Sequence, residues 1–105
     1  ELSHFVDSSH GLYIFGVQEA VSDAVFSRFA AYTNSVRLPL PPGSEGKGIV
    51  RGRGDGSFVS PKFTGIAVFA RRDIAEHARV VAVHGHSFGR TEGSKGSAGV
   101  VVRVY

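Results

Sequence analysis

The sequence Leu12-Tyr13-Ile14-Phe15-Gly16-Val17 is a short run of apolar, aromatic and β-branched residues, and a segment with a different pattern follows it directly. Such a run, bounded by polar residues, predicts a strand that is buried on both faces. From Glu19 to about Tyr32 the apolar residues recur near helical spacing and polar residues fill the other side, which predicts an amphipathic helix. A strand followed at once by a helix indicates a layered α/β arrangement.

Three further apolar runs predict strands in the second half of the chain. They lie at Phe63–Ala70, Val80–His84 and Val100–Tyr105, and a glycine-rich stretch from Gly85 to Gly96 separates the last two. The predicted fold class is therefore α/β (α+β), mostly sheet with one main helix. Because these strands find only part of their hydrogen-bonding partners within the segment, we expect the chain to belong to a larger sheet structure.

Length and composition limit the domain organisation. With 105 residues and 42% hydrophobic residues, the chain is predicted to form a single small domain over residues 1–105. Within it, residues 43–57 hold glycine, serine and charge with almost nothing apolar, which predicts an exposed Gly/Arg-rich loop. The longest apolar runs are too short to span a bilayer.

Charge and cysteine content narrow the chemistry. The formal net charge of +3 mildly favours anionic partners. Nucleic acid is not favoured, because the two arginines of the loop, Arg51 and Arg53, have no interleaved aromatic side chains on which bases would stack. The chain has no cysteine, so any bound metal must be held by oxygen or imidazole.

Glu19 is the candidate metal ligand. It directly follows the first predicted strand, and a carboxylate at a strand end is a suitable hard ligand for Mg²⁺, which takes only one or two protein carboxylates. A second explanation remains open at this point, because glutamate is also common in the first turn of a helix, where the helix dipole favours negative charge.

A second candidate is the segment Gly93-Ser94-Lys95-Gly96-Ser97. Its small residues allow backbone amides to approach an anion closely, and the lysine ammonium can neutralise a phosphate. The alternative is a flexible glycine-rich hairpin loop.

Two histidines, His84 and His86, are two residues apart, so on an extended segment their side chains point the same way. We interpret them as surface residues, because no third metal ligand stands out.

The order of these segments resembles that of the inositol-polyphosphate 5-phosphatases, a family of the endonuclease/exonuclease/phosphatase superfamily. Gly16-Val17-Gln18-Glu19 is similar to the family motif in which a strand ends in a metal-binding glutamate. The strand Phe63 to Arg71 looks like the family's Gly-Ile-containing strand that ends in arginine. Gly93-Ser94-Lys95-Gly96 resembles the family's Gly-Asn-Lys-Gly loop, which also precedes a valine-rich strand.

The resemblance implies a fold, a cofactor and a set of site residues. The fold would be a fragment of a two-sheet α/β sandwich as in DNase I-like proteins. Glu19 would bind Mg²⁺, and Gly93, Ser94, Lys95 and Gly96 would contact the substrate phosphate. Ser94 stands where the family has asparagine, so the polar contact made there would differ.

The implied function is hydrolysis of a phosphate monoester of an inositol polyphosphate or phosphoinositide. The implied location is the cytoplasm, with contact to the cytosolic face of membranes through the substrate. The family's amino-terminal asparagine-bearing strand and its Gly-Asp-x-Asn and Ser-Asp-His motifs have no counterpart here, so the general base is absent and the isolated chain is expected to be inactive.

Two rival functions remain. One is a phosphodiesterase or nuclease of the same superfamily, which would share the metal-binding glutamate but not the Gly-Asn-Lys-Gly type of loop. The other is a non-catalytic basic module that binds phosphoinositide headgroups or a protein partner through Arg90, Lys95 and the Gly/Arg-rich loop.

Overall fold

The computed structural model of the chain describes residues 7–20, 24–44, 49–51, 63–87 and 96–105; at 18–20, 49–51, 63–64, 87 and 96 it describes the backbone alone. The elements in chain order are β1 (Leu12–Ala20), α1 (Ala24–Thr33), β2 (Ser35–Arg37), β3 (Ile49–Arg51), β4 (Phe63–Arg71), the 3-10 helix η2 (Ala75–His77), β5 (Ala78–Ser87) and β6 (Gly96–Val104). The described residues thus form a mixed α+β structure, mostly antiparallel sheet with one α-helix, and the predicted coarse fold class is confirmed.

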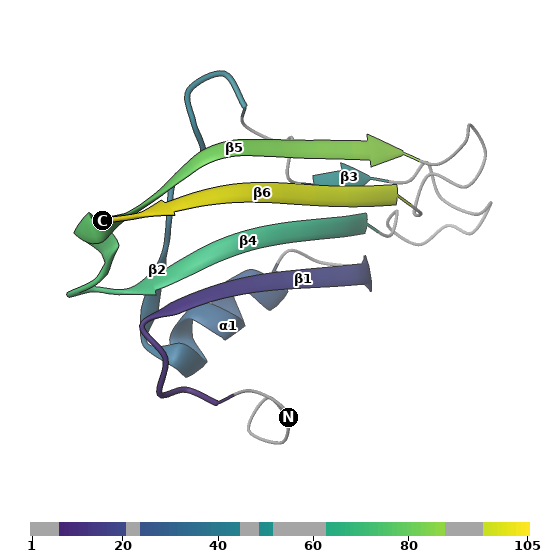
Figure 1. The fold of residues 1–105 in the computed structure, drawn as a ribbon. Helices are drawn as coiled ribbons and strands as arrows, with labels where there is room; N and C mark the ends of the chain where they lie inside the picture. Colours follow the sequence, from purple (N-terminus) through teal and green to yellow (C-terminus); the bar gives the residue numbers. More distant parts are fainter. Residues whose placement is uncertain (1–6, 21–23, 45–48, 52–62, 88–95) are drawn as a thin grey trace.

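Strand β4 is the centre of the larger sheet. It pairs with β1 along one edge, and β2 and β3 pair with opposite ends of its other edge, all in antiparallel orientation. Strands β5 and β6 form a separate two-stranded antiparallel sheet, which we call the β5–β6 hairpin. Figure 1 shows this hairpin alongside β4, with α1 near β1 and β4.

The two faces of β4 pack against different elements, because successive side chains of a strand point to opposite faces. Ala67 and Phe69 belong to a hydrophobic cluster with residues of α1. Val68 and Ala70 belong to a second cluster, which includes Ala78, Val80, Val100 and Val102 of the hairpin. The larger sheet is therefore covered by α1 on one face and by the hairpin on the other.

Aromatic side chains fix the position of α1. The Phe29 ring stacks on Phe15 of β1 with 4.0 Å between centroids and lies 5.0 Å from Phe69 of β4. Phe26 and Phe29 are each only 2% exposed. Aromatic contacts of this kind add to the hydrophobic burial of the rings, so the apolar side of the helix is held against β1 and β4.

The end of α1 is defined by local hydrogen bonding. The Oγ1 atom of Thr33 donates to the Phe29 carbonyl at 2.8 Å, and Asn34 follows in the left-handed region with φ of 50°. A left-handed residue, most often glycine or asparagine, is a common helix stop, and here it lets the chain enter β2 at Ser35 at once.

The predicted boundary between the first strand and the helix is wrong. The prediction ended the strand at Val17 and began the helix at Glu19, whereas β1 continues to Ala20 and α1 is described from Ala24. Backbone pairing explains the difference, because Ala20 is matched with Phe63 at the start of β4. Long-range pairing with a nine-residue partner outweighs the local helical pattern.

The predicted exposed loop at 43–57 is also corrected in part. Ile49–Arg51 forms β3 and pairs with the first residues of β4, and Ser44 is buried with 8% of its surface exposed. The Ser44 hydroxyl donates to the Pro41 carbonyl, which supplies a partner for this buried polar group. Residues 45–48 and 52–57 lie outside the described part of the chain.

The other predicted strands are confirmed but are longer than expected. β4 ends at Arg71, β5 covers Ala78–Ser87 and β6 covers Gly96–Val104, so the hairpin strands take up part of the predicted glycine-rich loop. Among the described residues, no helix has the length and apolar character needed to cross a bilayer.

Candidate functional site

Glu19 lies in the last part of β1, where the pairing with β4 is irregular. Val17 is matched with Gly65 and Ala20 with Phe63, so three steps along β1 correspond to two steps along β4. This one-residue excess is a β-bulge, a feature that re-aims side chains and is frequent beside active sites. The Glu19 side chain is outside the described atoms, so its role as a metal ligand stays a prediction.

The alternative explanation of Glu19 as a helix-starting residue does not hold. Glu19 belongs to a strand, and the first turn of α1, which begins at Ala24, contains no acidic residue. A helix dipole interaction therefore does not account for a glutamate at this position.

The predicted phosphate-binding segment is described only at its end. Gly96 is the first residue of β6 and is matched with Ser87, the last residue of β5. The preceding candidates, Gly93, Ser94 and Lys95, lie outside the described residues. Both interpretations of the segment, a phosphate-binding loop and a glycine-rich hairpin loop, therefore stay predictions.

The strand ends that carry the two candidates lie at the same end of the fold. Figure 1 shows the end of β1, the start of β4, the end of β5 and the start of β6 together at the right of the view. Strand β3, which pairs with the start of β4, also contacts both β5 and β6. The backbone positions near Glu19 and near Gly96, which are far apart in the sequence, thus lie at the same end of the fold (Figure 1).

His84 and His86 lie on β5 near this end. Both are exposed and both face away from the core, which confirms that they point the same way. Among the residues with described side chains, no group of three or more histidine, cysteine, aspartate or glutamate residues is arranged to hold a metal ion.

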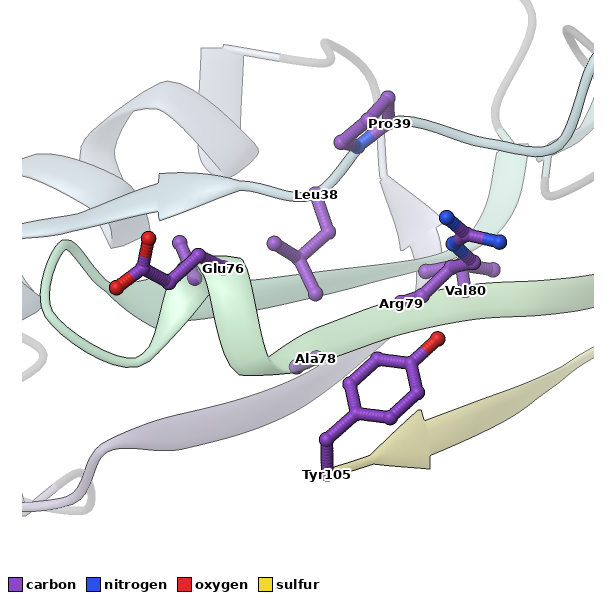
Figure 2. Close-up of a pocket in the computed structure, with 8 residues that line it drawn as sticks. Leu38, Pro39, Glu76, Ala78, Arg79, Val80 and Tyr105 are labelled. Atoms are coloured by element: carbon purple, nitrogen blue, oxygen red, sulfur yellow. The ribbon is translucent and has the colours of Figure 1, made fainter.

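A pocket of about 250 Å³ lies at the opposite end of the hairpin. It is lined by Leu38, Pro39, Ala75, Glu76, Ala78, Arg79, Val80 and Tyr105. Figure 2 shows the Leu38 side chain and the Tyr105 ring around the start of β5, with the Glu76 carboxylate and the Arg79 guanidinium well apart. The pocket is therefore separate from the end of the fold that carries the sequence candidates.

An exposed ion pair stabilises the turn after β4. The Arg71 guanidinium donates two hydrogen bonds to the Asp73 carboxylate, at 2.7 Å and 3.1 Å. These hydrogen bonds and the positive charge of Arg71 lower the pKa of Asp73 below its ordinary value.

Two arginines of the hairpin form a charged pair that the sequence does not reveal. Arg79 of β5 and Arg103 of β6 are matched directly across the hairpin, and both are exposed. They are 24 positions apart in a region predicted as two strands, so only the register of the hairpin reveals that they are neighbours. A direct alignment of the two valine-rich runs would not have found them, because the register shifts by one residue between Val80 and Ala82.

The scan of protein-family models, the search of curated proteins and the search of solved structures each found no match to this chain.

Proposed function

We propose that the chain is a segment of a magnesium-dependent phosphatase that hydrolyses a phosphate monoester of an inositol polyphosphate or a phosphoinositide. The observation that supports the proposal is the position of the two strand ends that adjoin the sequence candidates. The β1 bulge with Glu19 and the β6 start at Gly96 are at the same end of the fold, as a shared metal and phosphate site requires.

The donor set is compatible with Mg²⁺. A single carboxylate suits this ion, because Mg²⁺ is usually held by one or two carboxylates and keeps several water ligands. Glu19 would hold the metal, which when bound supplies positive charge that polarises a phosphoryl oxygen. Further ligands would come from other parts of a larger protein.

The residues of the β5–β6 connection would bind the substrate. The ammonium of Lys95 would neutralise a phosphate, and the amides around Gly93, Ser94 and Gly96 would donate to its oxygens. Cationic and amide donors that are already in position stabilise the charge that develops during phosphoryl transfer.

Two features of the fold support a larger domain of the DNase I-like type. The larger sheet carries a helix on one face and a second, smaller sheet on the other, an arrangement that would suit part of a two-sheet sandwich. Among the described residues, β1 pairs only with β4, which leaves its second edge available for a further strand.

The experiment is an assay of phosphate release in the complete gene product that contains this chain. With Mg²⁺ and inositol trisphosphate, Glu19→Ala is expected to lower kcat/KM by about 100-fold or more, because loss of even an outer-shell partner of a metal costs 10- to 100-fold. Lys95→Ala is expected to lower kcat by about 100-fold, as loss of one charge-stabilising donor does elsewhere.

Arg28→Ala is the matched control, since Arg28 is an exposed residue of α1 on the far side of the larger sheet. It should leave kcat/KM within about two-fold of the wild type. Unchanged activity in Glu19→Ala would contradict the proposal. Phosphoinositide binding that persists with a chelator and ignores Glu19→Ala would instead favour the non-catalytic binding module.

The isolated 105-residue chain is expected to release no phosphate. It has no counterpart of the family motifs that would supply the general base, so nothing in it would activate the attacking water.

A further inference from the structure

The outer face of the β5–β6 hairpin is the side that points away from β4. Alternation and register identify it together. Val80 and Val102 form a matched pair that packs into the core, so Arg79 and Arg103 beside them point outward. The one-residue register shift after Val80 places Ala82, which is matched with Val101, on the same outward side. The outward residues are all exposed: Arg79, Ala82, His84, His86, Ser97, Gly99, Val101 and Arg103. We call this set the outer face.

Arg79 and Arg103 are directly opposite each other on the outer face. Like charges at directly opposite positions of an antiparallel pair destabilise the sheet. Within the described residues, no ion pair joins either guanidinium to a carboxylate; the arginine that does form one is Arg71, with Asp73. Two adjacent guanidinium groups that lack a carboxylate partner form a site for an external anion.

The outer face carries no acidic side chain, so nothing on it repels an anionic partner. It also presents Val101, which is 56% exposed and lies two residues before Arg103 on the same face. Tyr105, 65% exposed, follows at the end of β6. Basic residues interleaved with an exposed aliphatic side chain and bordered by a tyrosine are typical of surfaces that contact a membrane interface.

The geometry of the face distinguishes a membrane from a small ligand. Arg79 and the strand end at Ser87 are eight residues apart, a distance of about 26 Å along β5. A small inositol phosphate would contact only the arginine pair at one end of this length, whereas a bilayer surface also reaches the exposed Val101 on the same face. The outer face carries no phenylalanine, tyrosine or tryptophan among its members, so base stacking on it could involve only the imidazoles of His84 and His86.

From these observations we infer that the outer face of the β5–β6 hairpin, with Arg79 and Arg103 at one end, binds anionic lipid headgroups at a membrane surface. This contact is independent of the proposed catalytic site. A phosphatidylserine bilayer can be the ligand here, although it contains no phosphate monoester to hydrolyse. A negative result for membrane binding would therefore not contradict the proposed phosphatase activity, and a negative result for phosphatase activity would not contradict membrane binding.

The experiment is co-sedimentation of the chain with vesicles of phosphatidylcholine, alone or mixed with phosphatidylserine. The wild type is expected to sediment with the mixed vesicles and not with phosphatidylcholine alone. Arg103→Ala should weaken the binding about five-fold, because one basic residue near an anionic surface contributes about 1 kcal/mol, and Arg79→Ala should do the same.

Arg103→Glu separates binding from folding. It places a carboxylate opposite Arg79, so the melting temperature should rise while binding to the mixed vesicles falls more than in Arg103→Ala. Arg28→Glu changes the net charge by the same amount on α1, on the opposite side of the larger sheet, and should retain most of the binding.

Three results would overturn the inference. Equal losses in Arg103→Glu and Arg28→Glu would mean that net charge alone drives the binding. Full binding of Arg103→Glu would place the contact elsewhere. A wild type that ignores phosphatidylserine vesicles but binds an acidic peptide or RNA through Arg79 and Arg103 would assign the outer face to a different partner.

Discussion

At the scale of single residues, the clearest electrostatic feature is the Arg71–Asp73 pair in the turn after β4. Both side chains are exposed, with about half or more of their surface accessible, so the ion pair is screened by solvent. Two hydrogen bonds from one guanidinium nevertheless favour the ionised carboxylate, and the pKa of Asp73 is lowered. A group with a depressed pKa links folding stability to pH in a defined direction.

We expect Asp73→Asn to lower the melting temperature slightly at neutral pH and not at all in strong acid. The stability that Asp73 contributes is fully present above its unfolded pKa of about 4, and it is lost as pH falls through the lower folded pKa. Thermal unfolding of wild type and variant between neutral pH and about pH 2 measures this. A difference between the two proteins that stays constant over the whole range would contradict the role given to the pair.

At the scale of elements, the connection after β2 depends on backbone conformation. Gly43 has a φ of 81°, in the region that side chains rarely adopt, and a Cβ placed there would meet nothing within 4 Å. Any cost of substitution at this position is therefore due to backbone strain rather than to a clash.

Gly43→Ala is expected to cost about 1 kcal/mol of unfolding free energy. Gly99→Ala is the matched control, because its Cβ would also meet nothing within 4 Å but the backbone of Gly99 is not in the left-handed region. The control should be neutral or slightly stabilising, since glycine weakens a strand. Urea denaturation of the two variants provides the comparison, and equal effects would contradict the argument.

The elements also show which parts of the fold are readable from the sequence. The strands around Tyr13, Val68 and Val100 were predicted because each is a continuous apolar run. β2 and β3 were not predicted, because strands of three residues are too short to show a periodic pattern and exist through their pairing with β4. For the same reason the strand end near Glu19 was misplaced, since Phe63 on β4 decides it.

At the scale of the whole molecule, the hairpin connects two proposed sites. The connection between Ser87 and Gly96 carries the predicted phosphate-binding residues, and Arg79 and Arg103 lie at the other end of the same two strands. The residue types of the first site could be predicted from the sequence. The arginine pair could not, because it depends on a register that the irregularity between Val80 and Ala82 shifts by one residue.

The central claim is that Glu19 and the segment ending at Gly96 form one metal and phosphate site. It is tested most directly by NMR spectra of the chain with inositol trisphosphate and a trace of Mn²⁺, a paramagnetic substitute for Mg²⁺. We expect broadened amide signals near Glu19, Phe63 and Gly96, unaffected signals at Arg79 and Tyr105, and loss of the broadening in Glu19→Ala. Broadening centred on Arg79 and Tyr105, or broadening that survives in Glu19→Ala, would contradict the claim.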